Sequence, residues 1–507
     1  MRRLTLAFVV LSLAACATTP PPAPAPAAVA ATPTATPAPN AASTLARLVD
    51  AYWQHRLEQD VNARAELGLP IEHLPDFSYA HEETEATFAQ SLLAQLDGID
   101  ENALAEDDRI TLAVLKNLQQ QTIDGLPHFY LHWWVTPYAS PIRGIGLAIV
   151  SMPLATADER ARYVRLVGEY GTFLDGIAEI TREQQRRGIL LPKPELPLVR
   201  AMIAGLRRPP EESMFAREGD AAFTAQVREA IATRVNPALS RILEIFSPAY
   251  ETAAPAGVGL AQYPGGAAAY RELVRESTTL DLDPREIHEL GLREVERINR
   301  EMADVRTQLG FTGTKAQFHQ FLRTDPRFFA TSAEEIGARL TSYVRRIEPQ
   351  IPKYFARLPR APYDVQRLDP ALEGGMTFGY YDAPKAHQTT GHYYFNGSKP
   401  NERSLLFAGA LMLHELIPGH HFQIARQLED ETIPLFRRRS FHTVFVEGWG
   451  EYSAWLGNEL GLYSDPYDHY GRLMMDAMLS SRLVVDTGMK PSAGRASARS
   501  SSCARTR

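Results

Sequence analysis

The residues best suited to chemistry gather in one short segment, 413-LHELIPGHHFQ. Within eight residues it holds three histidines and one glutamate: His414, Glu415, His420 and His421. Imidazole and carboxylate groups are ligands that zinc prefers, and a glutamate beside a metal-bound water can act as a general base. The usual helical zinc motif places its histidines four residues apart. Pro418 stands at that position here, so a different local geometry must bring the ligands together.

Two histidines compete for the place of the second ligand. On an ideal helix His421 lies about 20° from His414 around the axis, whereas His420 lies about 120° away. Pro418 lacks an amide hydrogen and clashes with the preceding turn, so a regular helix is not expected. If Pro418 and Gly419 bulge the helix, His420 takes the ligand position. We predict His414 and His420 as ligands and His421 as a catalytic donor to the developing oxyanion, with His421 as ligand the alternative.

A third ligand is available downstream, in 444-VFVEGWGEYSAWLGNEL. Glu447 and Glu451 lie four residues apart, on one face of the expected helix. Glu447 would complete a three-ligand zinc site that keeps an open position for water. Glu451, one turn further, could orient a zinc-bound histidine through its free ring nitrogen. A glutamate pair alone is usually a solvated surface feature, so the metal prediction depends on the pair together with the histidines.

Helical periodicity surrounds these residues. Apolar residues recur every three or four positions from about residue 42 to 243, beginning with Leu45, Leu48, Val49, Tyr52 and Trp53. A second helix is expected over 283-DPREIHELGLREVERINREM, with Asp283 as its N-cap and Pro284 in its first turn. The pattern returns at Ser404 and continues, with interruptions, to about Thr487.

Two short aromatic segments have the character of strands. The segments 376-MTFGYY and 391-GHYYFN are bounded by proline and glycine, as strands are. We therefore expect a mainly α fold with a small β-sheet beside the active cleft. The second strand is expected to hold an extended peptide by strand addition.

The N-terminus predicts export and a lipid anchor. Residues 1–16, MRRLTLAFVVLSLAAC, form a signal peptide whose apolar run is far shorter than the roughly 20 residues that span a bilayer. Its end resembles the bacterial lipobox, in which Cys16 is lipidated; ordinary signal cleavage is the alternative. By analogy with such lipoproteins, Ala17 favours the outer membrane, facing the periplasm. Residues 17–41 are a linker rich in proline and alanine, and the lipid is the only membrane contact we expect.

Composition limits the remaining possibilities. The chain has 507 residues, 45% of them hydrophobic and 22% charged, which is typical of a globular protein with a large core. The net charge of -7 and the dispersed basic residues exclude a nucleic-acid partner. The two cysteines are Cys16 and Cys503, so no disulfide is expected to support the fold. Nothing in the composition specifies an oligomeric state.

The metal segments resemble those of a known family. The chain is similar to the bacterial DUF885 proteins, whose signature has the form HExxPGHH followed by EGW. The match is HELIPGHHFQ from 414 and VEGWGEY from 446, with support from the helix at 284–302 and from 482-RLVVDTGM. That family is regarded as zincin-like and akin to M32 carboxypeptidases and angiotensin-converting-enzyme-type metallopeptidases. The resemblance covers about residues 45 to 490 and implies a helical fold, an elongated cleft and peptide hydrolysis.

The end of the chain departs from this resemblance. The predicted domain covers residues 42–489, after which 490-KPSAGRASARSSSCARTR is basic and of low complexity. We expect an out-of-frame tail in place of further family helices; a natural disordered tail is the alternative. The helix before it is then expected to expose five apolar residues: Leu473, Met474, Met478, Leu483 and Val484.

These features together predict a zinc-dependent peptide hydrolase of the bacterial envelope. Glu415 would take a proton from the metal-activated water and pass it to the leaving amine. One rival is an envelope lipoprotein that binds peptides or partners without turnover. Another is a structural zinc site that His414, His420, His421 and Glu447 close without water. The sequence specifies neither the substrate sequence nor exo- versus endopeptidase action.

Overall fold

A computed structural model describes residues 40–489, except 138–139, 371–372, 374–376 and 387. The described residues are mostly helical and include one three-stranded sheet, so the predicted fold class is confirmed. The predicted signal peptide, most of the linker, Cys16 and the tail from residue 490 lie outside the described residues. Among the helices of the described part, none is long and apolar enough to cross a membrane.

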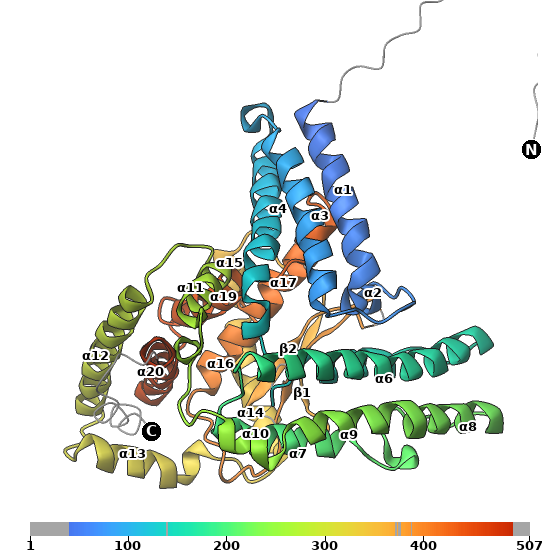
Figure 1. Cartoon of the computed structure of the whole chain (residues 1–507). Helices are drawn as coiled ribbons and strands as arrows, with labels where there is room; N and C mark the ends of the chain where they lie inside the picture. The colour runs from blue at the N-terminus through green and yellow to red at the C-terminus, as the bar shows by residue number, and fades with distance from the viewer. Residues whose placement is uncertain (1–39, 138–139, 371–372, 374–376, 387, 490–507) are drawn as a thin grey trace, which may run out of the picture. The chain divides into compact units, whose positions relative to one another are not determined.

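Helices near the N-terminus of the described chain pack as one group. They are α1 (Ala41–Gln59), α2 (Val61–Glu66), α3 (Tyr79–Asp97) and α4 (Glu106–Gly125). Helices α1, α3 and α4 lie side by side (Figure 1). Leu45, Leu48 and Trp53 are buried between them, as their periodicity predicted. The same core encloses the fully buried side chain of Phe436, which comes from the distant helix α18 (Leu435–Arg438).

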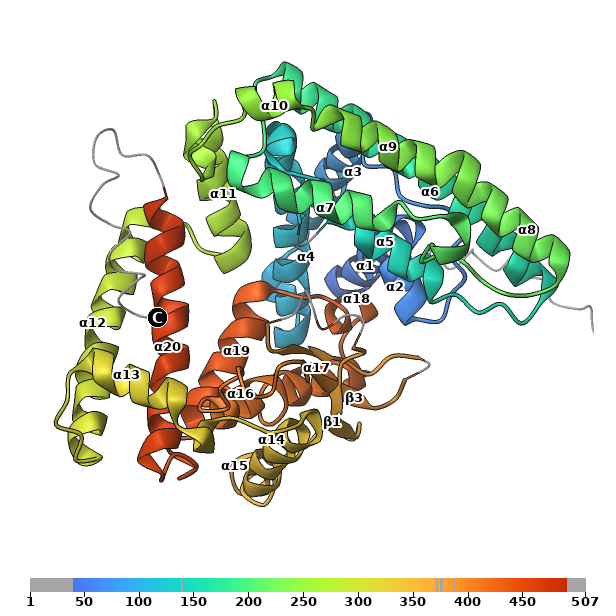
Figure 2. The same cartoon turned by 90° about the horizontal axis from the view of Figure 1, so that it is seen from below.

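A second group is built around one long helix. Its members are α5 (Pro141–Val150), α6 (Ala157–Arg186), α7 (Leu196–Leu206), α8 (Ala221–Ala230), α9 (Asn236–Ile245) and α10 (Pro248–Ala253). Helix α6 begins at a capping box, in which the side chain of Thr156 accepts a hydrogen bond from the backbone amide of Glu159, and the side chain of Glu159 accepts one from the backbone amide of Thr156. It packs along α8 and α9, which a π-helical turn at Ile231–Val235 joins (Figure 2).

Two long helices pack lengthwise on one another, with shorter helices beside them. This group contains α11 (Gly266–Thr278), α12 (Pro284–Gln308), α13 (Lys315–Thr324) and α20 (Pro466–Gly488). Helix α12 runs along α20 (Figure 2). It begins at Pro284 because the Asp283 carboxylate accepts a hydrogen bond from the Arg285 amide at 2.8 Å, which confirms the predicted N-cap.

The exposure expected on α20 is confirmed only in part. Met478 and Leu483 are exposed, and Met474 and Val484 are half-buried. Leu473 is 2% exposed, because it faces the core that α20 shares with α12 and α13. The expectation was therefore wrong for Leu473.

The remaining helices share one hydrophobic core with the sheet. The helices are α14 (Ala333–Ile347), α15 (Ile351–Tyr354), α16 (Ala408–Glu415), α17 (His420–Glu429) and α19 (Thr443–Leu456). Helix α16 begins at Ala408, four residues later than predicted, and the preceding Leu405 amide donates to the Phe328 carbonyl instead. Short 3₁₀ turns occur at Glu101–Ala103, Leu126–Leu131, Lys193–Glu195, Pro210–Glu212, Leu260–Gln262 and Pro326–Phe328.

The sheet has the order β1-β3-β2, with β1 (Tyr363–Arg367), β2 (Gly379–Asp382) and β3 (Gly391–Phe395). Strand β1 is parallel to β3, and β2 is antiparallel to it. The two predicted strands correspond to β2 and β3, although Met376 lies outside the described residues. Because β3 is the central strand, both of its edges are already paired. The expectation that it adds a peptide strand is therefore wrong, and β2 is an edge strand instead.

Candidate metal centre

Three predicted ligands converge from three helices. His414 of α16, His420 of α17 and Glu447 of α19 each offer a ligand atom, and these atoms lie within 4.8 Å of one another. His414 Nε2 is 3.6 Å from Glu447 Oε2, and His420 Nε2 is 3.9 Å from Glu447 Oε1. Both histidines are buried, whereas Glu447 is exposed. The set of two nitrogens and one oxygen suits zinc and leaves one side open.

A tight turn brings the two histidines together. Helix α16 ends at Glu415 and α17 begins at His420, so the chain breaks the helix where a bulge within it was expected. The Pro418 carbonyl accepts hydrogen bonds from Trp449 Nε1 at 2.7 Å and from Ser453 Oγ at 3.2 Å. Both donors lie on α19, so the turn is attached to the helix that carries the third ligand.

Two glycines make this arrangement sterically possible. A Cβ at Gly419 would lie 1.8 Å from the His414 carbonyl oxygen. A Cβ at Gly450 would lie 2.8 Å from Cε1 of the His414 ring. Glycine at these positions therefore lets the turn close and lets α19 approach the imidazole.

His414 is held by a chain of charged groups. Its Nδ1 is 2.8 Å from Glu451 Oε1, which is the contact predicted for Glu451. The other oxygen, Glu451 Oε2, accepts a hydrogen bond from Arg472 Nη1 at 3.1 Å. Arg472 is 4% exposed and also pairs with Asp476 at 2.7 Å. The chain leaves His414 Nε2 facing Glu447, which is the orientation a ligand needs.

The charges around the two histidines differ in their effect. Burial acts to lower the pKa of His414, but the hydrogen bonds to Glu447 and Glu451 outweigh it and raise the pKa to about 9. Burial and the neighbouring His414 lower the pKa of His420 to about 4. The carboxylates that hold a proton on His414 would equally hold a divalent cation. His420 Nδ1 is buried without a hydrogen-bond partner among the described residues, so its ring is less firmly oriented.

Glu415 lies next to this group in an environment that suits proton transfer. Part of its side chain is accessible, but protein surrounds most of it, and burial raises the pKa of the carboxyl to about 7. The backbone amide of Tyr381, on β2, donates a hydrogen bond to the carboxylate. A general base works best with a pKa near the operating pH.

His421 lies outside the metal group. Its Nε2 donates to the Ala361 carbonyl at 3.1 Å, so Nδ1 is left to accept from the Tyr381 hydroxyl at 3.0 Å. Burial lowers the pKa of His421 to about 4, which keeps the ring neutral. Because both ring nitrogens are occupied, this geometry argues against the predicted catalytic role of His421. It also argues against the alternative in which His421 is a ligand.

A family comparison bears on these residues. A family model described as "bacterial protein of unknown function (DUF885)" matches residues 62–500. The chain belongs to the DUF885 family. The family that the sequence resemblance indicated is thus confirmed, and both metal segments of this DUF885 chain lie within the matched residues. A comparison with curated proteins finds no match.

Two solved structures share the fold of this DUF885 protein. One is a candidate lipoprotein from Colwellia psychrerythraea, with 23% identity and a TM-score of 0.81, covering 92% of this chain and 86% of that one. The other is a candidate lipoprotein of unknown function from Shewanella oneidensis. It has 16% identity and a TM-score of 0.65, and the match covers 89% of this chain and 84% of that one.

The DUF885 site also contains two residues that sequence reasoning missed. Sequence reasoning missed Arg472, which stands among apolar residues of α20. A charged residue within such an apolar run is a signal that could have found it, because a buried arginine needs a partner. Tyr381 was read as one of several strand aromatics, and nothing in its spacing points to Glu415 or His421.

Proposed function

We propose that this DUF885 protein is a zinc-dependent peptide hydrolase. The observation that carries the proposal is the convergence of His414, His420 and Glu447 beside Glu415. Three ligands with an open side are typical of catalytic zinc rather than structural zinc. The hydrogen bonds of His421 to Ala361 and Tyr381 disfavour the closed four-ligand rival.

Each residue has a defined task in this mechanism. His414, His420 and Glu447 would hold the ion, and Glu451 would keep His414 in the ligating orientation. Bound zinc supplies a Lewis acid that polarises the scissile carbonyl and acidifies a water molecule. Glu415 takes the proton of the attacking water and delivers it to the leaving amine. The edge strand β2 offers an extended substrate a place to pair close to Glu415.

We infer that the protein works in the cell envelope, attached by a lipid at Cys16. The support is the signal-like segment at residues 1–16 and the description of both structural relatives as candidate lipoproteins. The outer membrane facing the periplasm is the proposed location, with peptides as substrates and no nucleic-acid partner.

Metal analysis followed by a digest of mixed peptides tests the proposal. The purified protein should hold about one zinc ion and cleave peptides. His414→Ala and Glu447→Ala should lose the metal, whereas Glu415→Gln should keep the metal and lose turnover. Full zinc occupancy in both ligand variants would overturn the site assignment. A zinc-loaded protein that binds peptides but cleaves none would favour the rival, a non-catalytic envelope protein.

A further inference from the structure

A large apolar cavity lies between α11, α12, α13, α16 and α20. Its volume is about 1280 Å³, which exceeds the roughly 300–1,000 Å³ of a usual small-molecule site. It can therefore hold several apolar side chains at once. Five of the 11 methionines of the chain line it: Met302, Met474, Met475, Met478 and Met489. Methionine is flexible and polarisable, so such a lining adapts to apolar ligands of different shape.

The cavity reaches the helix that carries the first metal ligand. Leu411 lines it and lies one turn before His414 and Glu415 on α16. Arg482 of α20 lines it as well. A chain that extends from the metal group past Leu411 therefore enters the same cavity that Arg482 lines.

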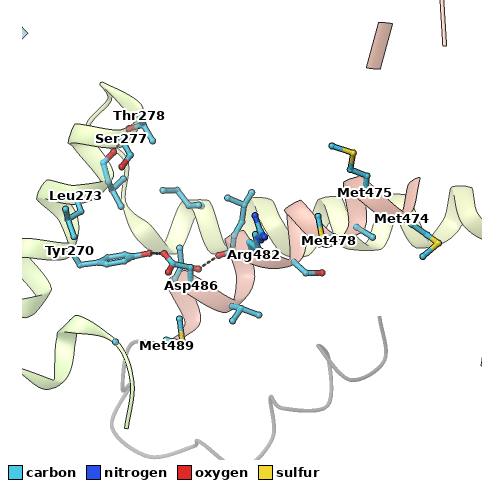
Figure 3. A pocket seen from close by; sticks show the side chains of 18 of the residues that line it. Tyr270, Leu273, Ser277, Thr278, Met474, Met475, Met478, Arg482, Asp486 and Met489 are labelled. Atoms are coloured by element: carbon cyan, nitrogen blue, oxygen red, sulfur yellow. Dashed lines mark hydrogen bonds between the residues drawn. The ribbon is translucent and has the colours of Figure 1, made fainter. Parts of the chain in front are cut away.

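Arg482 places a positive charge on the lining of the cavity. It is exposed, and it makes no hydrogen bond or ion pair with any residue that the structure describes. The other charged groups of the lining are engaged: Lys315 Nζ donates to Asn299 at 2.5 Å, and Asp486 accepts from the Tyr270 hydroxyl. Figure 3 shows Tyr270 reaching Asp486, with Arg482 one turn before it on the same helix. Among the described residues of this apolar lining, Arg482 thus offers a positive charge that is free to pair with a ligand.

On the basis of the proposed function, we propose that this cavity binds the C-terminal part of an apolar peptide substrate, whose terminal carboxylate pairs with Arg482. Charge determines which end of the peptide enters the cavity. Arg482 makes no hydrogen bond or ion pair with a described residue, so it attracts a carboxylate and repels a free ammonium group. An arginine fork also matches a carboxylate in a bidentate manner.

Equilibrium binding to the zinc-free full chain tests the proposal by calorimetry. The probes are the tripeptide acetyl-Leu-Phe-Leu as its free acid and as its C-terminal amide. The acid should bind about tenfold more tightly than the amide, and Arg482→Gln should remove this preference. Arg345→Gln is the matched control, because Arg345 is an exposed arginine of α14 outside the cavity and without a described partner.

A second pair of variants tests the apolar wall. Met478→Glu places a carboxylate one turn before Arg482 and should weaken binding of the acid about tenfold, whereas Met478→Leu should preserve it. Met478 is 43% exposed, so neither change disturbs a core.

Equal binding of acid and amide to the unmodified chain, or an unchanged preference in Arg482→Gln, would overturn the proposal. Tighter binding of dodecanoate than of the tripeptide acid would also overturn it, because the cavity would then belong to fatty acids. The calorimetry uses the zinc-free chain, so the binding result can be read even if the zinc-loaded protein does not hydrolyse peptides. Hydrolysis with an unaltered acid preference in Arg482→Gln would keep the proposed function and reject the role of the cavity.

Discussion

At the scale of residues, the charged chain behind His414 is a feature that can be separated from the ligands themselves. Arg472 touches no predicted ligand, and it acts on His414 only through Glu451. Removing such a supporting group typically weakens a metal site by about 10–100-fold while the ligands stay in place.

We therefore expect Arg472→Met to lower zinc affinity by about 10–100-fold in a competition titration with a fluorescent chelator. The single change also leaves Asp476 without its buried partner, so the melting temperature should fall. The double variant Arg472→Met with Asp476→Leu should recover the melting temperature but not the affinity. Recovery of both in the double variant would mean that Arg472 only maintains the fold.

The predictability of the site differs from residue to residue. His414, His420 and Glu447 could be predicted because two short segments of the sequence contain residues of ligand type at informative spacings. The choice between His420 and His421 depended on the turn at Pro418, whose course periodicity does not describe. Arg472 could not be named, since its role comes from a contact between α19 and α20.

At the scale of elements, the approach of α19 to α16 decides where the His414 ring can lie. The approach depends on a glycine in the middle of a helix, where glycine costs about 0.5–1 kcal/mol relative to alanine. The same helix carries Gly448, at which an added Cβ would meet nothing within 4 Å.

Gly450→Ala should consequently displace the His414 ring and reduce zinc affinity at least about tenfold. Gly448→Ala, on the same helix, should leave zinc binding unchanged and raise the free energy of unfolding by about 0.5–1 kcal/mol. Zinc titration and urea denaturation of both variants make the comparison. Equal zinc affinity in the two variants would contradict the steric role of Gly450.

Elements with a strong local signal were predictable, and elements defined by partners were not. The N-cap at Asp283 and the aromatic strands β2 and β3 carry such signals. Strand β1 reads YDVQR, in which Tyr363 and Val365 alternate with polar residues, but five residues with two such positions are too few to identify a strand, and its pairing with β3 does so. That pairing also places β3 in the centre of the sheet, which the sequence of β3 alone does not reveal.

At the scale of the whole molecule, buried neutral histidines make stability depend on pH. Burial, with Lys315 and Arg323 nearby, lowers the pKa of His319 to about 4, and burial lowers that of His421 to about 4. The unfolded chain binds protons at these histidines near pH 6.5, where the folded chain does not. The free energy of unfolding should therefore rise as the pH rises from about 4 to about 6.5.

His319→Gln should reduce the loss of stability between pH 7 and pH 5, because glutamine cannot take up a proton. Glutamine can still hydrogen-bond the Tyr470 hydroxyl, which His319 Nε2 contacts at 2.9 Å. His73→Gln is the control, since the His73 side chain is 80% exposed and should contribute little. Urea denaturation at the two pH values measures the difference. An unaltered pH dependence in His319→Gln would contradict the prediction.

Phe436 gives the helices at the start of the chain a part in assembling the metal group. It lies in the segment between the second and third ligands, yet its ring is buried among α1, α3 and α4. The connection from α17 to α19 is therefore held near its middle by the packing of Phe436, which divides one long loop into two short ones. Halving a loop lowers its closure entropy cost by about 0.6 kcal/mol. Helices that supply no ligand thus reduce the disorder that must be overcome when the ligands are brought into register.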